Sequence, residues 1–210
     1  MTDAELAGVR LRRTPRQARS REKVARMLEA ADRLLAREGT EALTTTRVAA
    51  EAGVSVGTLY QYLPDRDAIV DALADRSLTR LEALMESFVD RASLESWPDP
   101  AAVLVDSFAA LYRSEPGFRA LWFGRHLTEL TREADRGHKR VMATGLHRVL
   151  VAQHLLPDSP TARTACYTAF LAADAVIQEA FRTDPDGNPE LLHHLRTMLR
   201  AYLDRLVRVL

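Results

Sequence analysis

The chain has 210 residues, which is enough for a small domain and a larger one. Its 29 basic and 29 acidic side chains cancel, but residues 1–66 carry 12 basic and 9 acidic side chains, whereas residues 67–210 carry 17 and 20. A basic N-terminal part on an acidic remainder is typical of a DNA-binding domain attached to a body that does not bind DNA.

The sequence argues against several other classes of protein. A single cysteine, Cys166, excludes an intrachain disulfide and fits a reducing cytoplasm. Apolar stretches such as ACYTAFLAA fall well short of the ~20 residues that a membrane helix needs. The six histidines form no metal-binding motif, and no G-x-S-x-G or phosphate-cradling glycine loop occurs. We therefore predict a soluble, cytoplasmic protein that is not an enzyme and uses no metal or cofactor.

A strongly basic segment leads into the first predicted helix. Between residues 10 and 26, eight basic side chains stand against one glutamate. Such a segment can follow a phosphate backbone, and an N-terminal arm can reach an adjacent minor groove. A solubilising tail is the alternative that charge alone does not exclude. The helix itself is predicted from Thr14 to Gly39, with Pro15 at its first position and Gln17 in a capping box.

Residues 44–67 predict two short helices joined by a tight turn. Gly53 supplies the positive φ of the turn, and Ser55 caps the second helix, whose Leu59 and Leu63 point inward. A short outer face rich in hydrogen-bonding groups fits the major groove of DNA. An ordinary helical hairpin would explain the two leucines equally well, but not two outward tyrosines around a glutamine. The predicted outer face consists of Val56, Gly57, Thr58, Gln61 and one edge each of Tyr60 and Tyr62.

The run T-T-R-V-A-A-E-A-G-V-S-V-G-T-L-Y-Q-Y-L-P-D-R resembles the helix-turn-helix of the tetracycline-repressor (TetR) family, specifically over about residues 14–75. The resemblance implies that Thr46 and Arg66 hold phosphates and that Arg47 reaches a base edge. Leu63 and Pro64 replace the usual aromatic residue and its follower, so the operator sequence is not predictable. The other DNA contacts that the resemblance implies are Thr45, Ser55, Val56, which stands at a position often polar or basic, Gly57, Thr58, Tyr60, Gln61 and Tyr62.

Six more helices are predicted from the spacing of apolar residues and from the turns between them. The first is long and begins beside the DNA-reading unit, and in the resembled family this element moves the DNA-binding heads. The fourth has a polar first half, which we expect to be exposed or partly broken. No β-rich run occurs, so the fold is predicted to be all-α: a three-helix DNA-binding domain in residues 1–66 and a helical effector-binding and dimerisation domain in residues 67–210. The six helices cover residues 65–91, 100–113, 116–123, 127–155, 160–182 and 189–210.

The last two of these helices are apolar around most of their circumference. A helix that is apolar on several sides needs several partners. Two such helices adjacent in sequence form a hairpin that can pair with its twofold copy in a four-helix bundle. We therefore predict a homodimer with Leu195 and Leu199 in the interface.

A site for a small-molecule effector is predicted among the helices between residues 65 and 182. Asp174 lies inside the apolar segment LAADAVIQEAF, where a charge needs a partner. It either makes a structural bond or anchors a ligand, since ligand sites combine apolar walls with few polar groups. The candidate wall residues, each of which can also simply fill the core, are Phe108, Tyr112, Phe118, Trp122, Phe123, Met142, Tyr167 and Phe170.

Together these features predict a ligand-responsive transcriptional regulator. We expect a repressor that is released from palindromic double-stranded operator DNA by a small apolar or aromatic effector. Two alternatives stay open at this point: a small-molecule-processing enzyme, and a helical sensor whose DNA-binding head is vestigial.

Overall fold

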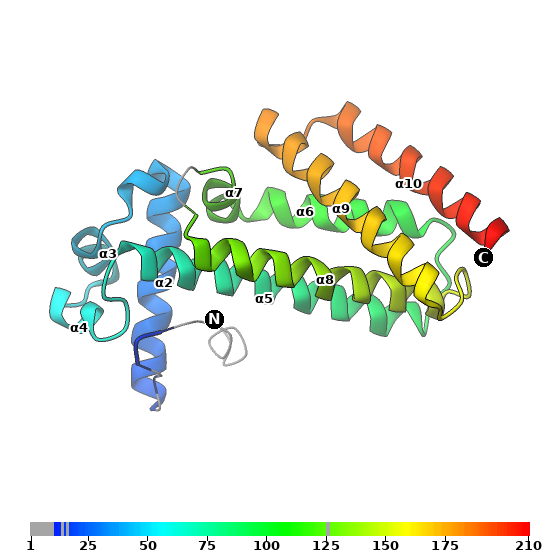
Figure 1. Cartoon of the computed structure of the whole chain (residues 1–210). Coiled ribbons are helices and arrows are strands. Elements are labelled where there is room, and N and C mark those ends of the chain that lie inside the picture. The colour runs from blue at the N-terminus through cyan, green and yellow to red at the C-terminus, as the bar shows by residue number, and fades with distance from the viewer. Residues whose placement is uncertain (1–10, 14, 16, 125–126) are drawn as a thin grey trace. The chain divides into compact units, whose positions relative to one another are not determined.

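The computed structural model describes residues 11–13, 15, 17–124 and 127–210. Within these residues the chain is helical and contains no strand, which confirms the all-α prediction. None of the described helices combines the length and apolarity that crossing a bilayer requires. The helices shown in Figure 1 are α2 (Ala18–Glu38), the short 3-10 helix η1 (Thr40–Ala42), α3 (Thr45–Ala52), α4 (Val56–Tyr60), α5 (Arg66–Ala92), α6 (Pro100–Ser114), α7 (Pro116–Trp122), α8 (Glu129–Ala152), α9 (Pro160–Thr183) and α10 (Pro189–Val209).

The chain divides into two compact units, each of them discontinuous in sequence. The first unit comprises Met1–Arg80 and Glu115–Asp135, and the second comprises Leu81–Ser114 and Arg136–Leu210. Helices α5 and α8 therefore contribute residues to both units. The predicted functional domains, residues 1–66 and 67–210, have a different boundary from these compact units, and that boundary stays a prediction.

Helix α2 is central to the first unit (Figure 1). It starts later than predicted, at Ala18, because Ser20 Oγ accepts from the Gln17 N–H at 3.2 Å and donates to the Gln17 carbonyl at 2.7 Å. The predicted cap Thr14 lies outside the described residues. The helix ends at Gly39, which has a φ of 76°. Its inner face packs on α3 and α7 and buries Val24, Met27, Leu28, Ala31, Leu34 and Leu35.

A buried ion pair joins α2 to α5 inside the first unit. Arg76 of α5 is only 2% exposed, and its Nη2 lies 2.9 Å from Oδ2 of Asp32 in α2. Burial lowers the pKa of Arg76, and the nearby carboxylate of Asp32 opposes that shift. Gly117 of α7 comes so close that a β-carbon there would lie 1.9 Å from the Asp32 carboxylate. One carboxylate therefore fixes the positions of three helices.

The start of α8 is fastened to α5 by hydroxyl groups. Thr128 Oγ1 accepts from the Thr131 N–H at 2.9 Å and so caps the helix. Thr131 Oγ1 in turn donates to the buried carboxylate of Asp71 at 2.7 Å, and Thr128 Oγ1 donates to the same carboxylate oxygen. The hydroxyl groups of Thr128 and Thr131 thus anchor the start of α8 to α5.

The second unit contains α6, α9, α10 and the remaining parts of α5 and α8. Phe88 of α5 makes edge contacts with Trp97 and Phe108 in its core. The side chain of His138 is buried in α8 and lies 2.9 Å from the carboxylate of Glu82 in α5. Helix α8 is continuous from Glu129 to Ala152. Most of its polar first half is exposed, as predicted, including Glu129, Arg132 and Arg136, whereas Thr131 and His138 are buried and bond carboxylates of α5.

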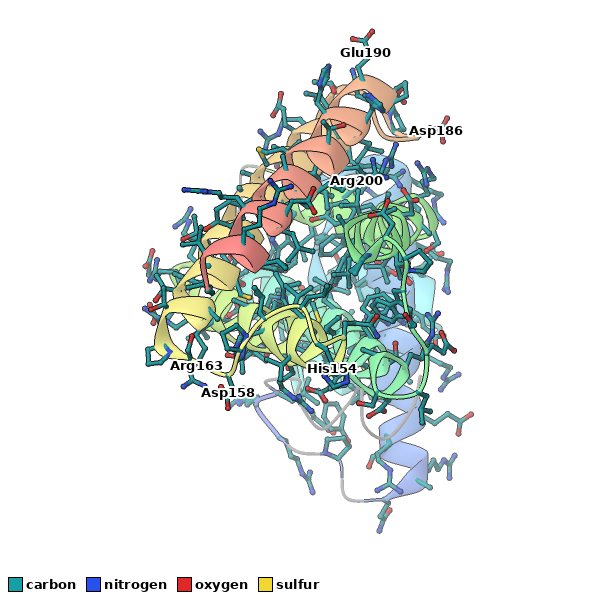
Figure 2. The ribbon with its side chains drawn as sticks, turned by 90° about the vertical axis from the view of Figure 1, so that its right-hand side faces the viewer. His154, Asp158, Arg163, Asp186, Glu190 and Arg200 are labelled. Atoms are coloured by element: carbon teal, nitrogen blue, oxygen red, sulfur yellow. The ribbon has the colours of Figure 1, made fainter. Side chains whose placement is uncertain are left out.

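Helices α9 and α10 form an antiparallel hairpin. Figure 2 places Asp158 and Arg163, which form an ion pair, at one end of the hairpin, and Asp186 and Glu190 at the turn between the helices. Asn188 caps α10 by accepting from two backbone N–H groups, each at 3.1 Å. Two ion pairs tie one side of α10 to its own chain. Arg196 pairs with Asp106 of α6 at 2.6 Å, and Arg200 pairs with Asp99, the residue before α6, at 2.7 Å.

Candidate nucleic-acid interface

The helix-turn-helix forms at α3 and α4 as the sequence predicts. Thr44 caps α3, and its Oγ1 accepts from the Arg47 N–H at 3.3 Å. Gly53 ends α3 in the left-handed conformation, with a φ of 65° and a ψ of 36°. Ser55 Oγ then accepts from the Thr58 N–H at 3.1 Å and caps α4. Each cap occupies the position at which the chain must change direction.

The inner and outer faces of α4 are clearly separated. Leu59 and Leu63 are completely buried, whereas Gly57, Tyr60 and Gln61 are exposed. Val56 and Thr58 are partly exposed, as is Thr45 at the start of α3. The exposed groups thus form the short polar face that the sequence predicts.

Tyr62 does not belong to this outer face. Its side chain is only 7% exposed, contrary to the prediction that one edge would face outward. Helix α4 ends at Tyr60, and residue 62 follows the inward residue Leu59 by three positions. Both the end of the helix and its period direct Tyr62 into the core.

Tyr60 is connected to α3 through its hydroxyl group. The Tyr60 hydroxyl lies 3.3 Å from Oγ1 of Thr45, so the first turn of α3 and the last residue of α4 share a hydrogen bond at the surface. Thr46, the next residue, is exposed and bonds Oγ1 of Thr44 at 3.2 Å. The hydroxyl groups of Thr45 and Tyr60, both predicted to contact DNA, therefore lie side by side.

The two arginines predicted to contact DNA already have acceptors within the protein. Arg47 Nη2 donates to both carboxylate oxygens of Glu38, at 2.7 and 2.8 Å. Arg66 Nη2 donates to the Thr40 carbonyl at 2.7 Å and lies 3.8 Å from Oε1 of Glu41. No sequence pattern predicts these acceptors, because they lie on other elements, 9 and 26 residues from the arginines.

A second carboxylate fastens α3 to α2. Oε1 and Oε2 of Glu51 accept from Arg33 Nε at 3.3 Å and from Arg37 Nη2 at 3.2 Å. These hydrogen bonds, first that of Arg37 and then that of Arg33, lower the pKa of Glu51. The helix-turn-helix is thereby held against α2 by charge as well as by its apolar core.

The described part of the basic segment lies against the end of α4. The Arg12 N–H donates to the Tyr62 carbonyl at 3.1 Å, while the Arg12 and Arg13 side chains are exposed. Pro15 is buried. The segment therefore brings positive charge close to the exposed face of α4.

The residues predicted to line an effector site fall into both compact units. Phe118, Trp122 and Phe123 belong to the first unit, where the Phe118 and Trp122 rings pack with centroids 4.9 Å apart and are both buried. The second unit holds Phe108, Tyr112, Met142, Tyr167, Phe170 and Asp174.

Of the candidates in the second unit, Tyr112 and Met142 are core residues. Tyr112 stacks on Phe181 at a centroid distance of 5.1 Å, and Met142 is 1% exposed. Asp174 is partly buried and bonds Lys139 of α8 at 3.1 Å and Gln178 at 2.9 Å. The partner that a buried charge requires is therefore a lysine.

The two leucines predicted for a dimer interface differ in exposure. Leu195 is 1% exposed within a single chain, so it is a core residue and not an interface residue. Leu199 is partly exposed. Leu192 and Leu195 form the side of α10 that faces its own chain, and a stripe this broad does not reveal from sequence which side that will be.

Family comparisons cover both parts of the chain. A family model described as "Bacterial regulatory proteins, tetR family" matches residues 27–73, and one described as "Tetracyclin repressor-like, C-terminal domain" matches residues 95–207. An uncharacterized HTH-type transcriptional regulator from Haemophilus influenzae is 36% identical over 64 residues, which are 30% of this chain and 34% of that protein. The match therefore spans only about a third of that relative.

Solved structures match over nearly the whole chain. A TetR-family transcriptional regulator from Streptomyces coelicolor is 30% identical, with a TM-score of 0.66 and coverage of 89% of this chain and 98% of the other. The transcriptional regulator FadR from Bacillus subtilis, solved in complex with stearoyl-CoA, is 15% identical, with a TM-score of 0.62 and coverage of 88% and 97%. At that identity the likeness to FadR shows the fold alone.

The fold, the helix-turn-helix and these matches define a regulator of transcription with an N-terminal DNA-binding unit. The chain belongs to the tetracycline-repressor (TetR) family. Members of this family are non-enzymatic DNA-binding regulators, which confirms the prediction that the protein is not an enzyme.

Proposed function

We propose that this regulator reads operator DNA with α4, the first turn of α3 and the basic segment before α2. The observation that carries the proposal is that residues 56–63, which comprise α4 and the turn after it, divide into a buried side with Leu59 and Leu63 and an exposed side with Gly57, Tyr60 and Gln61. Such a helix can enter a major groove without disturbing the core that holds it. The arginines of the arm supply the sequence-independent attraction to phosphates.

Selection of bound sequences from random duplex DNA, followed by fluorescence anisotropy in a salt series, tests this proposal. We expect an enriched sequence that binds at least about 1,000-fold more tightly than random DNA, which is the lower end for specific recognition. A protein that binds all duplexes alike would instead be a sensor with a vestigial DNA-binding head.

The exposed apolar residues of α10 support the proposal of a homodimer. Met198 and Val209 lie on one side of the helix and are 44% and 59% exposed, while Arg196 and Arg200 tie the opposite side to its own chain. Together with Leu199 and the exposed Leu171 of α9, these residues give the hairpin an apolar surface for a twofold copy. Two DNA-binding units related by twofold symmetry would recognise a palindromic operator.

We further propose a small, mostly apolar effector in the second unit, whose binding releases the repressor from DNA in the cytoplasm. Phe108, Tyr167 and Phe170 are only partly buried, and the Asp174–Lys139 pair lies on α9 and α8. The bound stearoyl-CoA of FadR is an example of a largely apolar ligand on the same fold. Mass spectrometry of material that co-purifies with the protein tests this assignment.

A further inference from the structure

Glu38 holds Arg47 in a particular way. The two carboxylate oxygens of Glu38 accept from the single nitrogen Nη2, at 2.7 and 2.8 Å. Among the described residues, the Nε and Nη1 atoms of Arg47 make no further hydrogen bond. Both side chains are about half exposed, at 44% and 42%. The guanidinium is therefore fixed at one corner while its other nitrogens stay open to solvent.

The Glu38–Arg47 pair is not needed to fasten α3 to α2. Glu51 already accepts from both Arg33 and Arg37 at that junction, whereas Arg37 approaches Glu38 only to 3.9 Å. Glu38 is also the last residue of α2, where the helix dipole disfavours a negative charge. An exposed ion pair contributes little to stability. A carboxylate at an unfavourable position, with little structural benefit, indicates a role at the DNA surface.

The chemistry of the guanidinium suggests what that role is. Arg carries five N–H donors in a planar fork, and holding it at one nitrogen leaves donors for a bidentate contact with O6 and N7 of guanine. A side chain already held in place loses less conformational entropy when it binds. The negative charge of Glu38 meanwhile opposes a nearby phosphate, so it disfavours use of the same arginine on the DNA backbone.

We infer that Glu38 is a positioning residue that directs Arg47 to a guanine edge and away from phosphate. This inference rests on the proposed reading of DNA by α3 and α4. It assigns to the operator a guanine opposite the start of α3, and it makes discrimination at that base pair depend on a residue of α2.

The test compares wild-type protein with Glu38→Gln on the selected operator, on the same operator with that G·C pair changed, and on random duplex DNA. We expect Glu38→Gln to bind random DNA more tightly and to lose about tenfold in discrimination at the one base pair, which is within the range of a single bidentate contact. The slope of log K against log salt should steepen by about one phosphate contact. The melting temperature should stay the same or rise, because a disfavoured charge leaves the end of α2.

Two controls separate positioning from a general change of charge. Glu22→Gln removes the same charge from the same helix but lies far from Arg47 in sequence, and discrimination should not change. In an Arg47→Ala background, Glu38→Gln should have no further effect on discrimination, since the two residues act as a pair.

Several results would overturn the inference. They are unchanged discrimination in Glu38→Gln, an equal loss in Glu22→Gln, and an equal loss in the Arg47→Ala background. A melting temperature that falls together with both affinities would show that Glu38 is merely structural. If wild-type protein itself has no preferred sequence, the proposed function fails first, which distinguishes the two failures.

Discussion

Arg76 is a charge almost completely withdrawn from water, and Asp32 is the carboxylate that compensates it. Removing one member of a buried pair is far more costly than removing an exposed pair, because an uncompensated charge remains. We expect Arg76→Ala to lower the free energy of unfolding by about 3 kcal/mol. Urea denaturation measures it, with Arg132→Ala as the control: Arg132 pairs with Glu129 at the surface, and its loss should cost less than about 0.5 kcal/mol. Equal losses of unfolding free energy in Arg76→Ala and Arg132→Ala would mean that the Arg76 guanidinium is not buried in solution.

The residues proposed to touch DNA divide into base readers and phosphate binders. Gln61→Ala should weaken binding to the selected operator by about 1 to 3 kcal/mol and relax the choice of base. Arg12→Ala should weaken binding to all duplexes alike and flatten the salt slope by about one unit. Anisotropy on operator and random DNA distinguishes the two patterns, and an unchanged base preference after Gln61→Ala would remove that residue from the readout.

Cys166 gives the protein a pH dependence at the alkaline end. Burial raises the pKa of its thiol from 9.0 to about 11. The unfolded chain therefore loses this proton near pH 9, while the folded chain keeps it, so unfolding becomes more favourable as the pH rises from about 9 to about 11. We expect this thiol to contribute a loss of no more than about 3 kcal/mol, seen as a steeper decline in wild-type protein than in Cys166→Ala. Parallel curves would show that the thiol titrates normally in the folded protein.

At the scale of the helices, the turn glycine and the helix glycine of the DNA-binding unit have opposite roles. A β-carbon would meet no atom within 4 Å at either Gly53 or Gly57, but Gly53 has a φ of 65°. Gly53→Ala should therefore cost about 1 kcal/mol through its backbone alone. Gly57→Ala should stabilise α4 by up to about 1 kcal/mol, yet weaken DNA binding because it adds bulk to the outer face. Thermal melting measures the stability of both variants, and fluorescence anisotropy measures their DNA affinity. Undiminished DNA binding by Gly57→Ala would show that DNA does not contact this face of α4.

Helix positions were largely predictable, because caps and breakers such as Ser55 and Gly39 act locally. Asp65 caps α5, its Oδ1 accepting from the Ala68 N–H at 2.7 Å. The burial of polar residues was not predictable in the same way. Thr131 is bonded by an aspartate 60 residues away in sequence, and no local pattern contains that information.

The candidate site shows the same limit. The exposed face of α4 could be read from its period, and Tyr62 was misplaced although that period puts it beside Leu59. The acceptor of Arg47 and the core position of Leu195 depend on how separate elements pack, which the spacing of residues along one helix does not specify.

At the scale of the whole molecule, the dimer proposal predicts different results for two residues of α10. Met198→Lys places a charge on the exposed apolar surface and should give folded monomers in sedimentation experiments. Leu195→Ala should leave the dimer surface intact but cost about 2 to 5 kcal/mol through a cavity in the core. Circular dichroism provides the control for folding. A dimer that survives Met198→Lys and Val209→Lys together would place the interface elsewhere.

The first compact unit joins Met1–Arg80 to Glu115–Asp135, and this has a consequence for the order of synthesis. A ribosome delivers the N-terminal helices first, whereas α7, which covers one side of α2, emerges only after all of α6. Until then the apolar side of α2 and the buried side of Asp32 lack their cover. The DNA-binding unit of the nascent chain is thus incomplete until residues 115–135 have been synthesised. A polypeptide that is truncated earlier lacks part of this unit.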